Sequence, residues 1–123
     1  MKRAFKTKTF NRWMSKAGLE DDVLREAVAE MEQGLFDADL GSGLVKKRVG
    51  LSGKGKRGGA RTIVATNYCG TWFFLFGYQK NERANISKRD EEVLKLLGAK
   101  LLRMNDSLIT AAIMAGQIKE IAL

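Results

Sequence analysis

The sequence of 123 residues predicts a single α+β domain, with a small, mostly antiparallel (mixed) sheet, an N-terminal helical hairpin and C-terminal helices. Two observations predict this class. Apolar residues recur at helical spacing near both ends of the chain, and β-branched and aromatic runs separated by turn residues fill the middle. The sequence has no proline, no low-complexity segment and no internal repeat, so nothing in its composition divides residues 1–123 into separate domains.

The N-terminal part of the chain is predicted to form one strand and two helices. Residues 3–7 alternate between polar and apolar side chains and are predicted to form a short strand. Apolar residues at i, i+3, i+4 and i+7 predict an amphipathic helix over residues 9–17, which Gly18 would end. A second helix is predicted from Asp21 to Gln33, because acidic residues occupy its first turn, where they meet the positive end of the helix dipole.

The middle of the chain is predicted to form strands. Residues 44–49 are expected to be a strand, followed by a glycine- and lysine-rich loop over residues 50–59. A β-hairpin follows, with strands over residues 61–67 and 71–78 joined by a short turn. Because the second of these strands holds five apolar residues in succession, it has no polar face and is expected to be central and covered on both sides.

Helices are predicted again toward the C-terminus. Ser87 is an N-cap residue that opens a third helix reaching about Met104. A short fourth helix is predicted from Asp106 to near Gly116. The tail over residues 117–123 fits either an edge strand or a segment that contacts a partner.

The charge balance favours an anionic partner. The chain carries 22 Lys and Arg against 14 Asp and Glu, a net charge of +8, which favours nucleic acid, an acidic protein or a membrane surface. The absence of His excludes mechanisms that need imidazole, including Ser-His-Asp triads and His-ligated zinc. The single cysteine, Cys69, excludes an internal disulfide and a Cys cluster for metal, and it fits a reducing compartment. The composition therefore excludes redox functions and structural zinc sites.

The sequence shows no targeting or membrane segment. The charged N-terminus is not followed by the apolar core of a secretory signal. The longest apolar stretches, residues 72–76 and 108–115, are too short to cross a bilayer. We therefore expect a cytoplasmic protein without a membrane partner.

Charges are segregated along the chain. Residues 1–18 carry six Lys or Arg and no acid, whereas residues 19–40 carry eight acids against Arg25 alone. Residues 41–79 carry seven bases and no acid. Because ordinary solvated surfaces intersperse both signs, this distribution predicts a functional basic face, with incidental clustering as the alternative.

A glycine-rich run over residues 53–59 places three cations within four residues. Its glycines permit close backbone approach and positive φ, so the loop can bring charge and bare N–H groups to a phosphate. It is not a Walker loop, because the sequence after it is strand-like and opens no helix. The alternative is a flexible hairpin loop that its lysines keep soluble.

The hairpin is expected to bring a second basic segment to this loop. In a tightly turned antiparallel pair, the start of the first strand lies beside the end of the second. Arg61 should therefore neighbour Tyr78, which is free to stack on a base. Lys80 and Arg83 follow directly, so cations from both segments would converge at one end of the sheet. The alternative places Tyr78 in the core and Arg83 in a surface ion pair with Glu82.

The glycine-rich run over residues 53–61, the hairpin after it and the segment over residues 80–85 together resemble bacterial toxins of the RelE/ParE superfamily, in particular its HigB-like branch. The likeness covers residues 2–104, so residues 107–123 form a C-terminal extension that covers the core or meets a partner. The resemblance implies a toxin that is neutralised by a cognate antitoxin of helix-turn-helix type. RelE-type relatives cut mRNA on the ribosome without metal or another cofactor, whereas ParE-type relatives poison DNA gyrase.

The resemblance and the clustered charges together indicate a set of site residues. The expected catalytic residues are Lys54, Lys56, Arg57, Arg61, Lys80 and Arg83. The residues expected to bind RNA around them are Lys46, Lys47, Arg48, Tyr78 and Asn81. Where the family carries a second arginine and a C-terminal tyrosine, this chain has Asn81 and Ser87.

Cleaving RNA without metal requires a base for the 2′-hydroxyl, positive charge for the phosphorane and a proton for the leaving oxygen. In a chain without His, a lysine crowded by like charges is a suitable base, because the crowding disfavours its charged form. The expected roles are base for Lys54 or Lys56, phosphorane stabilisation for Arg61 and Arg57, and positioning of the scissile phosphate for Lys80 or Arg83.

Two other functions fit the same sequence. A ParE-like gyrase inhibitor would arrest growth and induce the response to DNA damage while leaving mRNA intact. A non-catalytic RNA- or DNA-binding module would show steep salt-dependent binding without toxicity on expression.

Overall fold

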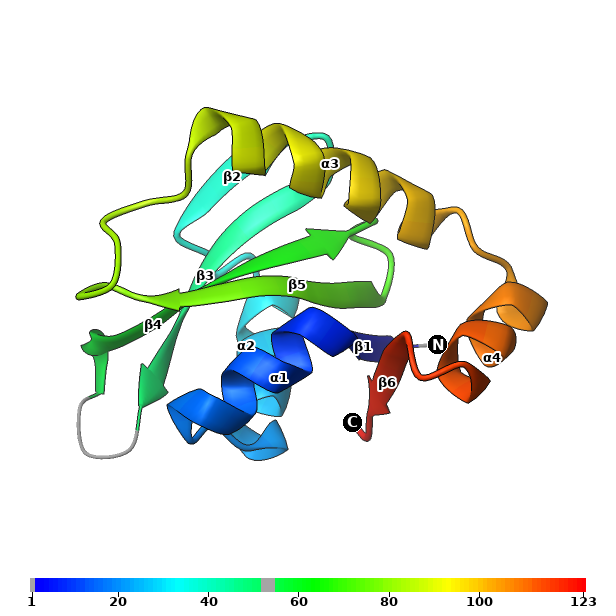
Figure 1. Cartoon of the computed structure of the whole chain (residues 1–123), viewed down its shortest axis with the longest axis horizontal. Helices are drawn as coiled ribbons and strands as arrows, with labels where there is room; N and C mark the ends of the chain where they lie inside the picture. The colour runs from blue at the N-terminus through cyan, green and yellow to red at the C-terminus, as the bar shows by residue number, and fades with distance from the viewer. Residues whose placement is uncertain (1, 52–54) are drawn as a thin grey trace.

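The computed structural model describes residues 2–51 and 55–123, and of residues 55–58 it describes the backbone alone (Figure 1). In chain order the elements are β1 (Arg3–Thr7), α1 (Lys8–Ala17), α2 (Asp21–Glu32), β2 (Ala38–Gly41), β3 (Leu44–Leu51), β4 (Gly55–Thr66), β5 (Thr71–Gln79), α3 (Lys88–Leu102), α4 (Asp106–Met114) and β6 (Ile118–Ile121). The described strands form one sheet of six in the order β2-β3-β4-β5-β1-β6, in which β1 runs parallel to β5 and the other neighbours are antiparallel. This architecture confirms the predicted α+β class with a mixed sheet.

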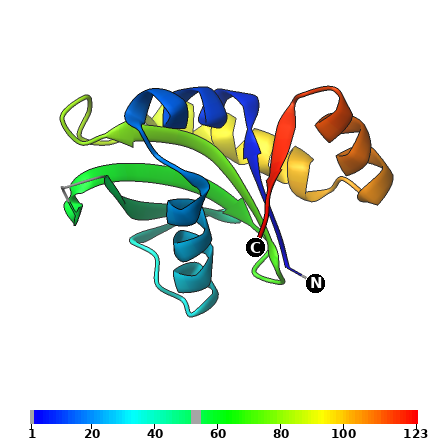
Figure 2. The same cartoon turned by 90° about the horizontal axis from the view of Figure 1, so that it is seen from below.

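The helices cover both faces of the sheet. Phe10 of α1 and Leu24 of α2 belong to the core on one face, whereas Leu94 of α3 and Ile109 of α4 belong to the core on the other. Figure 1 shows α3 above the sheet and α1 and α2 below it, and Figure 2, seen from below, shows α1 and α2 in front. As predicted, β5 is a central strand with buried side chains on both faces.

Helix boundaries follow the capping signals in the sequence. The Ser87 hydroxyl accepts a hydrogen bond from the N–H of Asp90 at 3.0 Å where α3 begins, and Asn105 caps α4 in the same way at 2.9 Å. Gly18 takes the left-handed conformation after α1, with φ of 75°, which a glycine adopts without strain. The predicted starts of α3 and α4 and the predicted end of α1 are therefore confirmed.

Most of the predicted loop over residues 50–59 is strand. β3 continues to Leu51 and pairs there with Gly55, the first residue of β4. Glycine has no side chain and so removes the alternation that indicates a strand. The first residues of β4 are therefore recognised as strand only from their pairing with neighbouring strands. β2 is also missing from the prediction, because its four residues are too few for their alternation to stand out in the sequence, and they form a strand by pairing with β3.

The C-terminal tail forms the edge strand β6. It pairs antiparallel with β1, and both Ile118 and Ile121 are buried. The Arg3 guanidinium bridges the pair by two hydrogen bonds to the Glu120 carboxylate, at 2.9 and 3.0 Å. Of the two alternatives for this tail, the structure shows the edge strand.

An extra residue in β5 interrupts its alternation. Ile63 pairs with Phe76 but Val64 pairs with Phe74, so Leu75 lies opposite no residue of β4. As a result, Leu75 and Phe76 both belong to the core beside α3, whereas Phe74 packs against α1.

Four acids of residues 19–40 form ion pairs with cations of β1, of β3 and of the residue before β1. The ion pairs are Lys2–Glu32 at 2.6 Å, Lys6–Asp21 at 2.7 Å, Lys47–Glu30 at 2.8 Å and Arg48–Asp37 at 2.7 Å. Two of these cations, Lys6 and Lys47, are buried, so removing either partner would leave an uncompensated charge in the core. The fold thus recombines charges that the sequence separates, and fewer cations remain for the predicted basic face.

Gly77 of β5 provides a test of the packing between the sheet and α1. A Cβ at this position would come within 2.3 Å of the Trp13 ring. We predict that Gly77→Ala lowers the free energy of unfolding by about 1–3 kcal/mol through overpacking, as measured by urea denaturation. In the double variant with Trp13→Leu the smaller side chain relieves the clash, so the combined loss should be smaller than the sum of the single losses. Simple additivity would contradict this contact.

Candidate nucleic-acid interface

Cations gather on the α3 side of the sheet, at the end where β4 begins and β5 ends. The register places Arg61 of β4 directly opposite Arg48 of β3 and Tyr78 of β5. Residues opposite one another in an antiparallel pair project from the same face, and Tyr78 packs in the core cluster that includes α3. These three side chains form one row, here called the cationic row, and Lys46 lies two residues from Arg48 on the same face of β3.

Arg61 occupies the centre of the cationic row. Its side chain is half-buried, and its Nη1 is fully buried without a hydrogen-bond partner in the described part of the chain. A buried guanidinium nitrogen without an acceptor is unfavourable. Because this atom is buried, a phosphate oxygen would supply that acceptor in a charge-assisted hydrogen bond only after the guanidinium turns toward solvent.

Arg83 approaches the row from the segment after β5. Its guanidinium lies 5.3 Å from the centre of the Phe76 ring, and its Nη1 is 3.6 Å from the carboxylate of Asp90 at the start of α3. Burial raises the pKa of Tyr78, while the charges of Arg61 and Arg83 both act to lower it. The structure therefore brings Arg61, Tyr78 and Arg83 together at one end of the sheet.

Asn85 connects the row to α3, and no signal in the sequence singles it out. Its Oδ1 accepts hydrogen bonds from the Lys46 ammonium at 3.0 Å and from the N–H of Ile86 at 2.9 Å. The Tyr78 hydroxyl donates to the same oxygen at 3.4 Å. Asn85 thereby fixes the positions of the ammonium and of the phenol relative to α3.

Tyr78 and Lys47 do not take the places that the sequence predicts for them. Tyr78 is only 2% exposed, so its ring cannot stack on a base, and the alternative that places it in the core is confirmed. Lys47 lies on the opposite face of β3, where it is 5% exposed and its Nζ contacts Glu30. Side chains alternate along a strand, so Lys47 faces α2 while Lys46 and Arg48 face the other way.

Arg48 lies in the row but already has a carboxylate partner. Asp37 accepts a hydrogen bond from its Nε at 2.7 Å and another from its backbone N–H at 2.6 Å. Although burial of the carboxyl opposes the effect, these hydrogen bonds hold the pKa of Asp37 below its ordinary value. The row thus contains one neutralised guanidinium beside Arg61, which has no carboxylate partner in the described part of the chain.

The turn after β5 presents exposed polar side chains. Lys80 and Asn81 are exposed, and their side chains form no hydrogen bond or ion pair in the described ranges. Glu82 accepts a hydrogen bond from the N–H of Gln79 at 2.8 Å. Glu82 therefore fixes this turn and does not form the ion pair with Arg83 that the sequence offered as an alternative.

Three predicted catalytic residues are not fully described. Lys54 lies outside the described residues. The backbones of Lys56 and Arg57 belong to the first residues of β4, on the strand that leads to Arg61, and their side chains lie outside the description.

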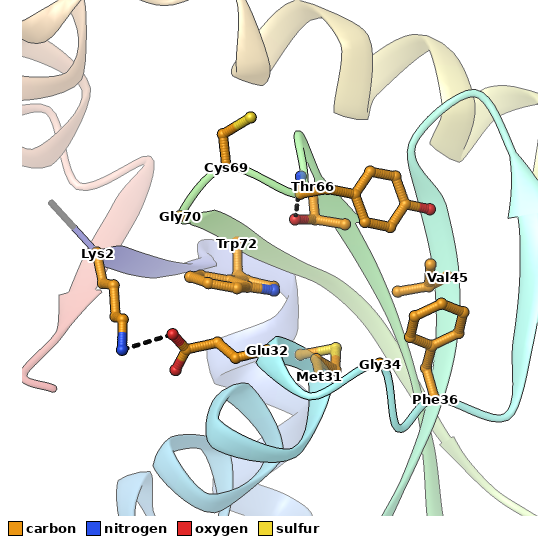
Figure 3. Close-up of a pocket in the computed structure, with 11 residues that line it drawn as sticks. Lys2, Met31, Glu32, Gly34, Phe36, Val45, Thr66, Cys69, Gly70 and Trp72 are labelled. Atoms are coloured by element: carbon orange, nitrogen blue, oxygen red, sulfur yellow. Dashed lines mark hydrogen bonds and ion pairs between the residues drawn. The ribbon is translucent and has the colours of Figure 1, made fainter.

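A separate pocket of about 580 Å³ lies beside the turn that joins β4 to β5, at the other end of the hairpin (Figure 3). Its apolar lining is formed by Met31, Phe36, Val45 and Trp72. Lys2 is the cation among its lining residues, and the Lys2 ammonium is paired with Glu32 at 2.6 Å. Among the described residues, this pocket therefore offers no free positive charge to a phosphate, and no predicted site residue that the structure describes lines it.

Comparison with known proteins identifies the family. The sequence matches the family model of the RelE toxin of the RelE/RelB toxin–antitoxin system over residues 2–121. The chain belongs to the RelE toxin family. It is therefore a toxin whose family partner is a cognate antitoxin, and the match reaches β6, beyond the residues 2–104 on which the resemblance was based. The comparison with curated proteins gives no match.

The helices of this RelE-family toxin offer no membrane span. Of the helices in the described ranges, none is both long and apolar enough to cross a bilayer.

The two tyrosines of the toxin, Tyr68 and Tyr78, allow the cationic row to be tested by titration. Burial raises the pKa of both above 10.0, and Asp39 raises that of Tyr68 further. In a Tyr68→Phe background, we predict that Arg61→Gln raises the pKa of Tyr78 further, because the substitution removes a positive charge that lowers this pKa. Ultraviolet difference spectroscopy of tyrosinate formation measures this shift.

Arg103→Gln at the exposed end of α3 is the matched control and should leave the pKa of Tyr78 unchanged. Because the folded pKa exceeds the unfolded one, the neutral phenol adds stability that is complete below about pH 10 and is lost as the pH rises through the folded pKa. A Tyr78 pKa that does not respond to Arg61→Gln would contradict the proximity of the two side chains.

Proposed function

We propose that this RelE-family toxin is an endoribonuclease that cuts mRNA on the ribosome without a metal ion, with Arg61 as its central phosphate ligand. The observation that carries the proposal is the buried Nη1 of Arg61, at the centre of the cationic row, which has no hydrogen-bond partner among the described residues. Membership of the RelE toxin family supports it, because it makes the protein a toxin.

The reaction breaks the bond between phosphorus and the 5′-oxygen of the next nucleotide. The 2′-hydroxyl gives its proton to a base and its oxygen attacks phosphorus, which forms a phosphorane with added negative charge. The 5′-oxygen then leaves with a proton, and a 2′,3′-cyclic phosphate remains. Catalysis therefore needs a base, an acid and fixed positive charge where the negative charge develops.

Arg61 suits the phosphorane because a guanidinium keeps its charge and presents several N–H donors in a fixed fork. No existing hydrogen bond of its Nη1 has to break before RNA binds, since this atom has none among the described residues. Arg83 suits the positioning of the scissile phosphate. Its side chain is 44% exposed and its 3.6 Å distance to Asp90 exceeds an ordinary hydrogen bond, so a phosphate can compete for it.

The remaining roles rest on the sequence. In this proposal Lys54 or Lys56 is the base, Arg57 is a second ligand of the phosphorane, and Lys80 is an alternative to Arg83. Lys46, Arg48 and Asn81 would contact the flanking nucleotides. Lys47 and the ring of Tyr78 are left out of the RNA-binding set, because both are buried in the core.

Substitution of Arg61 tests this proposal. We predict that Arg61→Ala lowers the rate of mRNA cleavage about 10²- to 10³-fold, the loss typical of a donor that stabilises developing negative charge. Single-turnover cleavage of mRNA on programmed ribosomes measures the rate. Arg103→Ala, the same change of charge at the far end of α3, should cleave at the wild-type rate.

Three results would argue against this function. Full cleavage by a correctly folded Arg61→Ala toxin would remove Arg61 from the mechanism. Intact mRNA together with a response to DNA damage on expression would favour the ParE-like gyrase inhibitor. Steeply salt-dependent binding of nucleic acid without growth arrest would favour the non-catalytic binding module.

A further inference from the structure

The outer face of α3 carries exposed apolar side chains. Val93 is 57% exposed, Leu96 is 75% exposed and Leu97 is 37% exposed. Their spacing of i, i+3 and i+4 places them side by side on one face of the helix, here called the α3 stripe. The opposite face of α3 packs on the sheet through Leu94 and Leu101. Figure 1 shows no described element over the outer face of this helix.

Such a stripe is unusual on a surface that has no partner. Scattered apolar residues are normal on protein surfaces, but adjacent large ones mark interaction sites. The exposed residues on α4, Leu108 and Met114, are six positions apart and so do not form a comparable stripe. The α3 stripe, in contrast, places three exposed apolar side chains side by side, as expected of a surface that binds a partner.

The charges beside the α3 stripe define the chemistry of that partner. Arg89, Lys100 and Arg103 are exposed and form no ion pair within the described ranges, whereas Glu92 is the unpaired acid on this side. The two other acids in the first turn of α3 already have cationic neighbours. Asp90 lies 3.6 Å from Arg83, and Glu91 forms an ion pair with Lys95 at 3.2 Å. The stripe is thus bordered by excess positive charge.

We propose that the α3 stripe is the docking surface for an amphipathic helix of the cognate antitoxin, with apolar residues at helical spacing and acidic residues beside them. The stripe with its flanking bases spans Arg89 to Lys100, about 16 Å or three helical turns, which matches one such helix. Apolar contact would supply affinity, and acidic flanks would pair with Arg89 and Lys100.

A second copy of this chain fits the stripe poorly. Two α3 helices packed antiparallel across a two-fold axis would bring Arg89 of one copy toward Lys100 of the other. Like charges across an interface are unfavourable, and in the described ranges the acids beside the stripe are Glu92 and Asp90, of which Asp90 already lies 3.6 Å from Arg83.

The position of α3 also explains how such a partner would silence the toxin, a consequence that rests on the proposed function. The first turn of α3 carries Asp90, which approaches Arg83, and Asn85 lies just before this turn in contact with Lys46. A bound helix that continues past Arg89 would place its acidic residues over the cationic row. Docking itself depends on the stripe and not on the ribonuclease chemistry.

Binding of the full-length cognate antitoxin, measured by isothermal titration calorimetry, tests the proposal. Leu96→Glu should weaken binding about tenfold or more, because it places a charge in the apolar contact. Leu108→Glu on α4, at a residue 54% exposed, is the matched control and should change the affinity by less than about threefold. Since Leu96 is largely exposed, the variant should keep the wild-type circular dichroism spectrum and melting temperature.

Charge substitutions test the acidic character of the partner with effects of opposite sign. Lys100→Glu should weaken binding and Glu92→Lys should strengthen it, and both effects should shrink as salt is raised. The reverse pattern would overturn the assignment of an acidic helix.

Wild-type affinity of Leu96→Glu for the antitoxin would overturn the proposal as a whole. The same holds if sedimentation shows a toxin dimer that Leu96→Glu dissociates without change in antitoxin affinity, because the stripe would then be a contact between copies. These binding results are independent of mRNA cleavage by Arg61→Ala, so failure of either proposal is recognised separately.

Discussion

Main-chain pairing of β4 with β3 and β5 holds together side chains that repel one another. Arg48 and Arg61 lie directly opposite because the ladder fixes their register, although like charges at such positions are destabilising. Asp37 offsets this repulsion at Arg48, and Asn85 holds the ammonium of Lys46. The Nη1 of Arg61 has no hydrogen-bond acceptor among the described residues. The sheet therefore holds at this point a positive charge that an anionic ligand would stabilise.

The helices and the hairpin could be predicted because near neighbours in the chain decide them. Apolar periodicity sets α1 and α3, and the caps at Gly18 and Ser87 mark their limits. The start of β4 and the whole of β2 depend on β3, which lies next to both in the sheet. No local pattern in a glycine-rich or four-residue segment carries that information. The ion pairs that reduce the basic face could not be predicted for a related reason, since only the fold brings the acids of α2 against Lys6 and Lys47.

Part of the site followed from the position of one turn. Antiparallel geometry alone brings Arg61 beside Tyr78 and near Arg83. The division between Lys46 and Lys47 requires knowing which face of β3 is covered by α2, and the burial of Tyr78 requires knowing where α3 crosses the sheet. These are properties of the packed layers, so the run of bases in β3 could not reveal them.

The unpaired Leu75 has a consequence for how relatives of this toxin should be compared. A strand that alternated regularly from Phe73 would point Gly77 toward α3 and Tyr78 toward α1. The irregularity exchanges them. The Trp13 indole of α1 therefore packs against Gly77, which has no side chain, while Tyr78 lies opposite Arg61 on the α3 side of the sheet. A homologous chain that lacks the residue equivalent to Leu75 would still direct the next two residues toward α1 and α3 as Gly77 and Tyr78 are directed here. Alignments of such sequences should therefore show a single-residue gap at this position.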